Sequence, residues 1–256
     1  MDHKKINNGH TPRSKDICSD CHLRRNDLFC QLPPADRLGL DQIKTTKSYP
    51  KGARLFVEGQ PADGVYMLCQ GKVKLSACSK DGKVLILGIS DAGDVLGLSA
   101  AVNGQEYETT AEVIGACQVN YIKTADLVKF LKKHPEACFN AARQLSRDYQ
   151  TAYRQICSLG LSGSVIDKLA KLFLGWSGKE TGNGNGNGNG SDKIHIHLTH
   201  EEIAAKIGAS RETVTRTLKY FREQGLISIK RSHLVVLDRK GLSALIGSRR
   251  GVPHDM

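Results

Sequence analysis

Three cysteines near the start of the chain have the residue type and the spacing for metal or redox chemistry. They are Cys18, Cys21 and Cys30, out of eight cysteines in 256 residues. The opening residues are polar, and the longest apolar stretch, Val84–Ile89, is too short to span a bilayer. We therefore expect a soluble cytoplasmic protein with no membrane partner. Because thiols stay reduced in the cytosol, structural disulfides are not expected, and clustered cysteines indicate metal ligands or redox groups.

The charge of the chain favours a second kind of chemistry, the binding of polyanions. Lys and Arg number 37 and Asp and Glu number 26, which gives a formal net charge of +11. This balance fits nucleic acid, an anionic membrane surface or an acidic protein, and it says nothing about the fold. The class of partner therefore has to come from a motif.

The segment Leu198–Phe221 supplies that motif. Thr199 followed by Glu202 makes a capping box, which predicts a short helix that begins at about His200. Gly208 is expected to end this helix, and Ser210 to cap a second one. A helix, a tight glycine turn and a helix are the sequence form of the helix-turn-helix DNA-binding motif.

The second helix of this motif is expected to have one buried and one reading face. Val214, Leu218 and Phe221 recur at helical spacing and are expected to face the core. Arginine can bind guanine O6 and N7 with two hydrogen bonds, glutamate can accept one from cytosine N4, and lysine can pair with a phosphate. The alternative is a charged face that only contacts solvent. The predicted DNA-contacting residues are Thr199, Ser210, Arg211, Glu212, Thr215, Arg216 and Lys219.

A basic hairpin follows this helix. Leu226–Ile229 and Leu234–Leu237 are apolar strands on either side of Lys230-Arg231-Ser232-His233. We expect this hairpin to be a wing that contacts phosphates.

The elements that must position these residues begin with a β-rich region. Short β-branched runs punctuated by glycine extend from about Tyr49 to Tyr121, which predicts a small all-β sandwich or barrel. Within it, Lys72–Ser79 and Lys83–Ile89 flank Asp81-Gly82, a dipeptide that supplies the positive φ angles of a tight hairpin.

Helical periodicity begins at Thr124 and continues over a long stretch. One apolar seam on so long a helix needs a partner surface, and a second copy of the helix would supply it, so we expect a homodimer. The alternative is that the helix packs on its own barrel. The seam residues are Ala137, Ala141, Leu145, Ala152, Ile156 and Leu159.

A further amphipathic helix, capped by Ser162 or Ser164, follows, and then a Gly/Asn repeat. Because neither glycine nor asparagine buries apolar surface, residues 182–191 are expected to be a flexible insert. We divide the chain into a cysteine-bearing arm (1–35), a β-roll sensor domain (36–132), a dimerisation helix (133–160) and a winged helix-turn-helix domain (161–248).

These motifs together resemble the CRP/FNR superfamily of transcription regulators, from about Leu38 to Leu245. The resemblance rests on Gly71-Lys-Val-Lys-Leu75, Asp81-Gly82, Gly93-Asp-Val-Leu-Gly97, Ala116-Cys-Gln-Val119 and above all Ser210-Arg-Glu-Thr-Val-Thr-Arg216. It implies an α+β fold with a cyclic-nucleotide-binding-like β-roll, a long dimerisation helix and a C-terminal winged helix-turn-helix.

The resemblance also implies a mode of action. A homodimer would bind a palindromic operator in double-stranded DNA, with two recognition helices about 34 Å apart, and would act on RNA polymerase. By carry-over, Arg211, Glu212 and Arg216 would contact bases, whereas family members differ at the position of Thr215. The rival function is a metal or redox sensor that acts through protein contacts without specific DNA binding. An enzyme is not expected, because the chain has no Gly-x-Ser-x-Gly elbow, no His-Glu-x-x-His helix and no nucleotide fingerprint.

The resemblance also bears on the effector. The cAMP-binding branch of the family has an Arg-Ser pair for the cyclic phosphate, where this chain has Glu108-Thr109-Thr110, so no cyclic-nucleotide response is expected. The oxygen-sensing branch has an N-terminal cysteine arm and one barrel cysteine, which Cys18, Cys21 and Cys30 resemble.

The fourth ligand of such a cluster is the difficulty, because Asn120 aligns with the barrel cysteine and Cys117 lies three residues earlier. An odd shift on a strand reverses the face, so Cys117 is expected to point into the barrel. Cys69, Cys78 or a non-cysteine ligand are the other candidates. An iron–sulfur cluster, a zinc site that adds His22, and thiols without metal therefore remain open. Cys138 and Cys157 are expected to be small packing residues of the long helix.

Overall fold

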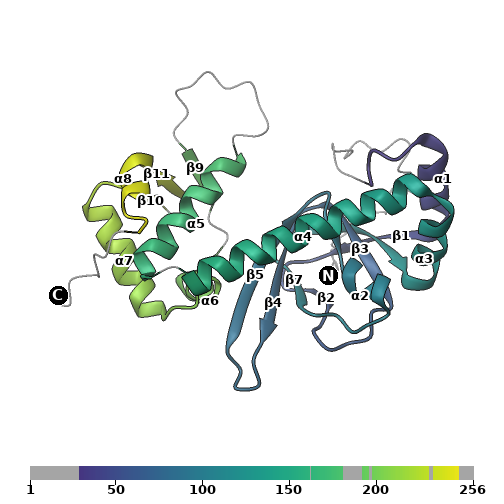
Figure 1. Cartoon of the computed structure of the whole chain (residues 1–256), viewed down its shortest axis with the longest axis horizontal. Helices are drawn as coiled ribbons and strands as arrows, with labels where there is room; N and C mark the ends of the chain where they lie inside the picture. The colour runs from purple at the N-terminus through teal and green to yellow at the C-terminus, as the bar shows by residue number, and fades with distance from the viewer. Residues whose placement is uncertain (1–28, 162, 181–191, 196–197, 231–232, 248–256) are drawn as a thin grey trace, which may run out of the picture.

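The computed structural model describes residues 29–161, 163–180, 192–195, 198–230 and 233–247. A β-rich lobe and a mainly helical lobe are joined by one long helix, α4 (Pro135–Leu161), as Figure 1 shows. The predicted α+β architecture is therefore confirmed. Cys18 and Cys21, the Gly/Asn insert, and Arg231 and Ser232 of the wing lie outside the described residues.

Two antiparallel sheets form the β-rich lobe. The first has the order β1-β8-β3-β6 and the second the order β2-β7-β4-β5. The strands are β1 (Lys44–Tyr49), β2 (Arg54–Phe56), β3 (Gly64–Gln70), β4 (Lys72–Cys78), β5 (Val84–Asp91), β6 (Val95–Leu96), β7 (Thr110–Val113) and β8 (Cys117–Lys123). The predicted barrel is present, with its short strands separated by glycine turns.

Two apolar clusters lie on opposite faces of the first sheet. Alternate residues of β3 divide between them, because successive side chains of a strand point to opposite faces. Tyr66 and Leu68 join the barrel interior, whereas Val65 and Met67 join a cluster with the helices. These helices are α1 (Pro34–Ile43), α2 (Leu98–Asn103), α3 (Thr124–Lys133) and the first turns of α4.

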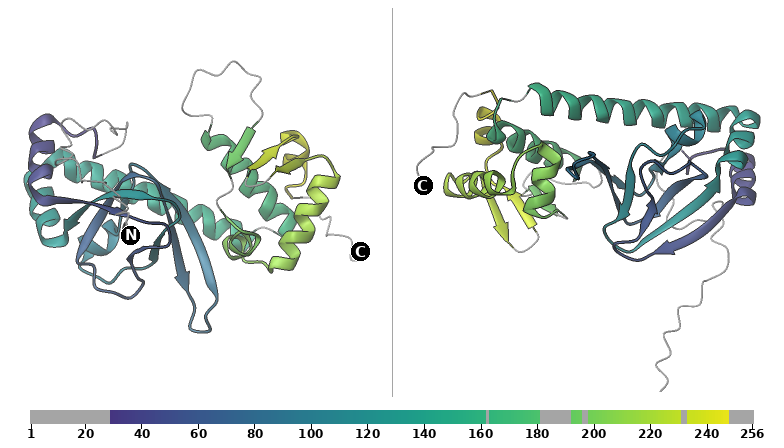
Figure 2. Two further views of the ribbon diagram at one scale, coloured as in Figure 1. Left: turned by 180° about the vertical axis from the view of Figure 1, so that it is seen from behind. Right: turned by 90° about the horizontal axis from the view of Figure 1, so that it is seen from below.

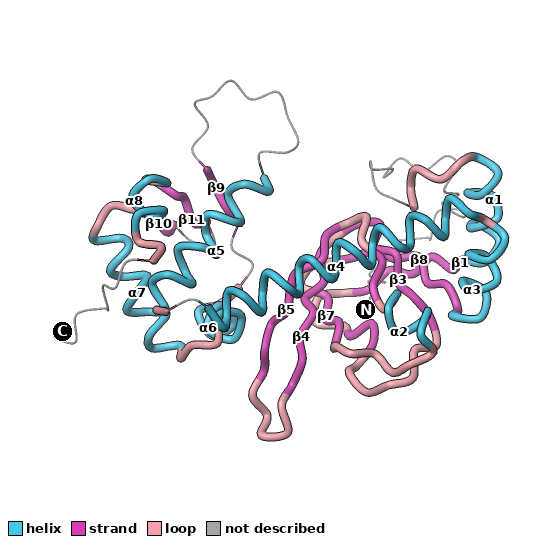
Figure 3. Tube along the Cα trace, in the orientation of Figure 1, coloured by secondary structure: helices cyan, strands magenta, loops and turns pink. Residues whose placement is uncertain are grey.

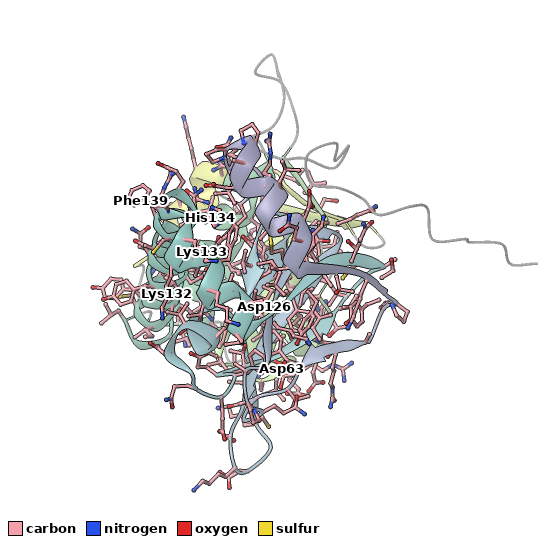
Figure 4. All side chains as sticks on the ribbon, turned by 90° about the vertical axis from the view of Figure 1, so that its right-hand side faces the viewer. Asp63, Asp126, Lys132, Lys133, His134 and Phe139 are labelled. Carbon is pink, nitrogen blue, oxygen red and sulfur yellow. The ribbon has the colours of Figure 1, made fainter. Side chains whose placement is uncertain are left out.

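The end of the predicted arm belongs to this helix-covered core. Within the segment 1–35 that we assigned to the cysteine-bearing arm, Phe29 and Leu32 are buried in the helical cluster, and α1 begins at Pro34. α1 is tied to the junction of α3 and α4 by the contact of His134 Nδ1 with Asp36 Oδ1 at 2.8 Å. Figure 4 shows this end of the molecule, with His134 close to α1. Sequence reasoning missed α1 because its weak apolar periodicity follows a polar, cysteine-bearing segment.

The β4–β5 hairpin forms as predicted and extends from the β-rich lobe (Figure 3). Gly82 has a φ of 78°, and the turn is closed by Ser79 N–H donating to the Lys83 carbonyl at 2.9 Å. The hairpin also reaches the second lobe, since Ile86 is buried in that lobe's hydrophobic core.

α4 runs along both lobes (Figure 2) and has two apolar faces rather than one. Ala137 and Ala141 are buried against the chain's own barrel, with Leu145 partly buried beside them. The prediction that these residues form a dimer contact was therefore wrong for the N-terminal half of α4, where they pack on the same chain. A different, exposed stripe follows at three- and four-residue spacing: Phe139, Ala142, Ser146, Tyr149, Tyr153, Ile156 and Gly160.

This stripe contains most of the helix's large exposed apolar side chains. Tyr149 is 70% and Ile156 67% exposed, and Phe139 points away from the sheets in Figure 4. Cys138 is exposed too, so its expected role in packing was wrong, whereas Cys157 is partly buried.

The C-terminal lobe packs its helices on a small sheet of order β10-β11-β9. Its helices are α5 (Val165–Glu180), α6 (His200–Ile207), α7 (Arg211–Glu223) and α8 (Arg239–Ala244), and its strands are β9 (Asp192–His195), β10 (Ile227–Lys230) and β11 (His233–Val236). Ser164 caps the start of α5 by accepting a hydrogen bond from the backbone N–H of Asp167 at 3.1 Å. β10 and β11 are the predicted wing. Over the described part of the chain, no helix is both long and apolar enough to cross a membrane.

Candidate nucleic-acid interface

The local sequence of the motif fixes where α6 and α7 begin and end. The Thr199 side chain accepts from the backbone N–H of Glu202, and the Glu202 carboxylate accepts from the backbone N–H of Thr199, so the predicted capping box is present. Gly208 ends α6 with a φ of 64°, a left-handed conformation that glycine adopts without strain. Ser210 caps α7 by accepting from the backbone N–H of Thr213 at 3.2 Å.

One face of α7 is fixed in the core of the C-terminal lobe. Val214 and Phe221 are fully buried and Leu218 is nearly so, as predicted. Phe221 meets Phe173 of α5 edge-on, with ring centroids 6.3 Å apart. Thr217, which sequence reasoning did not assign, is also fully buried, and its hydroxyl donates to the Thr213 carbonyl at 2.8 Å. This packing sets the rotation of α7 about its axis.

The opposite face of α7 is exposed. Arg211, Glu212, Thr215, Arg216 and Lys219 are all accessible to solvent, and α7 lies at the outer edge of its lobe in Figure 1. No described part of the chain covers these five residues. The face predicted to read DNA is therefore free to meet a partner.

The Glu212 carboxyl on this face is held in its ionised form. Hydrogen bonds from its own backbone N–H and from the Ser210 side chain hold the pKa of the Glu212 carboxyl below its usual value. Lys219 Nζ lies 3.7 Å from Glu223 Oε1, one turn further along the helix. An exposed pair of this kind contributes little to stability, so Lys219 can turn to a phosphate.

His200 belongs to the same surface, although sequence reasoning did not select it. It is the first residue of α6, and its Nδ1 lies 3.0 Å from the Thr215 hydroxyl of α7. The Thr215 hydroxyl also lies 2.9 Å from the Arg211 carbonyl oxygen. Spacing within one helix cannot reveal a contact between two helices, and for this reason the pair was missed.

The back of the motif is attached to the β-rich lobe through α6. Lys74 Nζ of β4 lies 2.8 Å from Glu202 Oε1 and 3.4 Å from Glu112 Oε2. Burial works to lower the pKa of Lys74, but its contacts with the two carboxylates outweigh burial and raise it. Burial likewise works to raise the pKa of Glu202, and the contact with Lys74 reverses this effect. Both groups are therefore charged in the folded protein, and the pair links the two lobes.

The predicted cysteine site is only partly within the described residues. Cys117 is 3% exposed and lies in the barrel interior, as expected from its position on β8, and burial raises the pKa of its thiol. Asn120 is buried too, and its Oδ1 accepts from Thr46 at 2.8 Å. Phe29, the neighbour of Cys30, packs on the other face of the same sheet. Among the residues that can be described, no three His, Cys, Asp or Glu side chains are grouped to hold a metal ion.

The barrel interior contains aromatic as well as aliphatic side chains. Phe56 and Tyr107 stack with ring centroids 4.0 Å apart. The Tyr107 hydroxyl donates to the Gly64 carbonyl at 2.6 Å, and burial raises the pKa of its phenol. Tyr107 stands directly before Glu108, and the hydroxyl of Thr110 accepts from the backbone N–H of Glu58 at 3.1 Å. No cationic side chain occurs from Gln105 to Val113.

Comparison with known proteins places both lobes in described families. Residues 167–245 match the Crp-like helix-turn-helix domain, and residues 46–134 match the cyclic nucleotide-binding domain. The CRP-like cAMP-activated global transcriptional regulator of Mycobacterium tuberculosis is 25% identical over 224 residues, which covers 86% of this chain and 96% of that protein. The transcriptional activatory protein AadR of Rhodopseudomonas palustris is 27% identical over 225 residues, which covers 88% and 91%.

A solved structure supports the same relationship. A transcriptional regulator of the CRP/FNR family from Thermus thermophilus superposes with a TM-score of 0.63 and 28% identity. The superposition covers 80% of this chain and all of that one.

Proposed function

Because the chain belongs to the CRP/FNR family of transcription regulators, we propose that it binds a palindromic operator as a homodimer, with α7 of each subunit in a major groove. Arg211, Glu212, Thr215 and Arg216 contact base edges in this proposal, and Lys219 contacts a phosphate. Thr199 and Ser210, at the N-termini of α6 and α7, contribute phosphate contacts. The operator-bound dimer acts on transcription through RNA polymerase.

One observation carries the DNA-reading proposal: α7 is buried on one side and bare on the other. The full burial of Val214 and Phe221 fixes the helix, and the exposure of Arg211 and Arg216 leaves their guanidinium groups free. Each arginine can form two hydrogen bonds with a guanine. A surface loop with the same residues would lack this fixed orientation, which base reading requires.

The exposed stripe of α4 supports the homodimer. Tyr149, Tyr153 and Ile156 repeat at the spacing of a coiled-coil seam, and a single chain leaves them in water. A second α4 packed along the same stripe would bury these side chains about a two-fold axis. Palindromic DNA has the same symmetry, so dimerisation and operator recognition belong together in this proposal.

The decisive experiment measures DNA binding by the full chain. Affinity should fall steeply with salt on every duplex, and one palindrome should bind far more tightly than random DNA at the same salt concentration. Arg216→Ala should cost about 1–3 kcal/mol at one base position of each half-site. Arg222→Ala removes the same charge from the last turn of α7, and it should lower affinity for all sequences alike. If Arg216→Ala leaves affinity for the best palindrome unchanged, the assigned reading face is wrong.

We also propose that this barrel does not respond to cyclic nucleotides, in contrast to the mycobacterial relative, whose name describes it as cAMP-activated. Glu108, Thr109 and Thr110 offer no cation for a cyclic phosphate, and a buried phosphate needs a counter-charge. Calorimetric titration with cAMP and with cGMP should show no binding at about 1 mM nucleotide. The dissociation constant would then exceed about 1 mM, which corresponds to a binding free energy of roughly 4.1 kcal/mol or less. Tight binding of either nucleotide would contradict the proposal.

For the signal input we propose the cysteine arm, with an oxygen- or redox-sensitive iron–sulfur cluster as the form to test first. Cys18, Cys21 and Cys30 have the ligand type that such clusters use. Cys117 fits poorly as their fourth ligand, because its thiol lies among apolar side chains of the barrel interior. Anaerobic purification followed by visible absorption and by iron, sulfide and zinc analysis separates the three hypotheses. A colourless protein with zinc, or with no metal, would exclude the cluster.

A further inference from the structure

The contact between α6 and α7 contains a chain of three polar atoms. His200 Nδ1, Thr215 Oγ1 and the Arg211 carbonyl oxygen are separated by 3.0 Å and 2.9 Å in that order. His200 and Thr215 are both exposed, and Thr215 belongs to the face of α7 proposed to meet DNA. The three atoms therefore lie where base edges would approach.

Counting hydrogens fixes the direction of both contacts. A carbonyl oxygen can only accept, so the single hydroxyl hydrogen of Thr215 has to be donated to Arg211. The His200 contact is then a hydrogen bond only if Nδ1 carries a hydrogen and donates it to Thr215 Oγ1. The Thr215 oxygen is left with one lone pair and no hydrogen for any further partner.

We propose that His200 is a positioning residue that fixes Thr215 as a hydrogen-bond acceptor toward DNA, so that Thr215 selects an amino base over a keto base. Adenine N6 and cytosine N4 present donors in the major groove, whereas guanine O6 and thymine O4 present acceptors. A lone pair aimed at O6 or O4 is repelled, and one aimed at an amino group forms a hydrogen bond. This inference rests on the proposed reading of DNA by α7.

His200 matters because the hydrogen bond that Thr215 receives strengthens the one that it gives to the Arg211 carbonyl. Without the Nδ1 donor, the hydroxyl hydrogen is held less firmly on Arg211 and can be donated to guanine or thymine. Loss of His200 should therefore blur the base preference more than it weakens binding.

The test measures relative affinities of the full chain for palindromes varied one base at a time in each half-site. The wild type should prefer adenine or cytosine over guanine or thymine, by about fivefold or more, at the one position that responds to Thr215. Thr215→Val keeps the shape and removes the hydroxyl, so it should abolish this preference and favour thymine through methyl contact. Thr215→Ser keeps the hydroxyl and should keep the preference.

Variants of His200 test the positioning role separately. His200→Ala should reduce the preference at that position about threefold or more, while affinity for the best palindrome changes less than about twofold. His200→Asn restores an N–H donor near the place of Nδ1 and should recover the preference. Nitrogen NMR of the DNA-free protein should show that His200 Nδ1 carries a hydrogen and donates it to Thr215. Thr215→Val should remove the signal of this hydrogen bond. Thermal unfolding confirms that each variant is folded.

The outcomes separate this inference from the function on which it rests. If the wild type binds no palindrome better than random DNA, the DNA-reading proposal and the inference are both wrong. If palindrome binding is intact but Thr215→Val leaves every base preference unchanged, only the inference is overturned. An unprotonated His200 Nδ1 in the free protein would overturn the positioning role.

Discussion

α7 and α4 are both amphipathic helices, and they differ in how their apolar residues are arranged. α7 has one apolar face, with Val214, Leu218 and Phe221 buried and its polar face exposed. α4 has apolar residues on two faces, since Ala137 and Ala141 pack on the barrel and Tyr149 and Ile156 are exposed. Periodicity located the buried face of α7 correctly, but it merged the two faces of α4 into one seam. A helix that serves two partners shows no single stripe in its sequence.

The largest effect should come from the buried face of α7. Phe221→Ala should destabilise the C-terminal lobe by about 3–5 kcal/mol, because it leaves a cavity beside Phe173. The only tryptophan of the chain, Trp176, lies 5.8 Å from Phe173 between ring centroids, so its fluorescence during urea unfolding reports on this lobe. Gln150→Ala, at an exposed position of α4 outside the stripe, should shift the same transition by about 0.5 kcal/mol or less. Equal effects of the two variants would contradict the contrast between the helices.

The exposed stripe of α4 should be sensitive to added charge at the proposed dimer contact. Tyr149→Glu combined with Ile156→Glu should weaken dimerisation at least about 100-fold, or roughly 2.7 kcal/mol, because two charges from each subunit would be buried at the interface. Light scattering after size-exclusion chromatography gives the mass at each concentration. The matched control is Ala152→Glu together with Arg143→Glu, which places charges at exposed positions beside the stripe. A dimer that survives the first pair and not the second would place the interface on another face.

Loss of the N-terminal cap of α6 should have an intermediate effect on stability. Thr199→Ala removes the side-chain acceptor of the capping box, so we expect a loss of about 1 kcal/mol and faster amide exchange in the first turn of α6. Thr151→Ala, at an exposed position of α4, should have an effect below about 0.5 kcal/mol. If the amide of Glu202 exchanges no faster in Thr199→Ala than in the wild type, the capping box does not stabilise the first turn of α6.

The smallest effect concerns the edge of α4 that faces the barrel. Burial raises the pKa of Asp148 to about 6, and the Asp94 carboxylate adds to the rise against the opposing hydrogen bond from Gln144. Because the folded state holds this proton more tightly than the unfolded chain does, stability should fall as the pH rises from about 4 to 6, and should stay lower above this range. Asp148→Asn should remove that dependence and raise stability above pH 6 by less than about 1 kcal/mol, since the side chain is only partly buried and solvent screens its charge. Thermal unfolding of the wild type and of Asp148→Asn across this pH range measures the dependence. If the stability of both proteins changes with pH in the same way, Asp148 is not its source.

These contrasts also explain which features the sequence could predict. The boundaries of α6 and α7 depend on local signals, namely a capping box, a left-handed glycine and a serine cap, and all three formed as predicted. The face of Cys117 followed from the two-residue period of a strand. The stripe of α4 could not be found in the same way, because small residues such as Ala137 and Ala141 are compatible with either a barrel contact or a dimer contact.

The pairing of His200 with Thr215 was also beyond the reach of the sequence. The two residues are 15 positions apart, on different helices, and come together only because the turn at Gly208 sets the angle between α6 and α7. The burial of Phe29 and Leu32, just before α1, was missed for a similar reason, since it depends on a surface made by distant strands. Tertiary contacts of this kind leave no local pattern.

The β4–β5 hairpin gives the molecule a property that neither lobe has alone. Ile86, from the hairpin, is buried in the core of the C-terminal lobe, and Lys206 Nζ donates to the Leu87 carbonyl at 3.3 Å. Separating the lobes would expose Ile86 and leave a void among the helices that surround it. The DNA-binding lobe is thus not an interchangeable module: a graft onto another sensor would have to bring along this hairpin, or replace the side chain that it inserts.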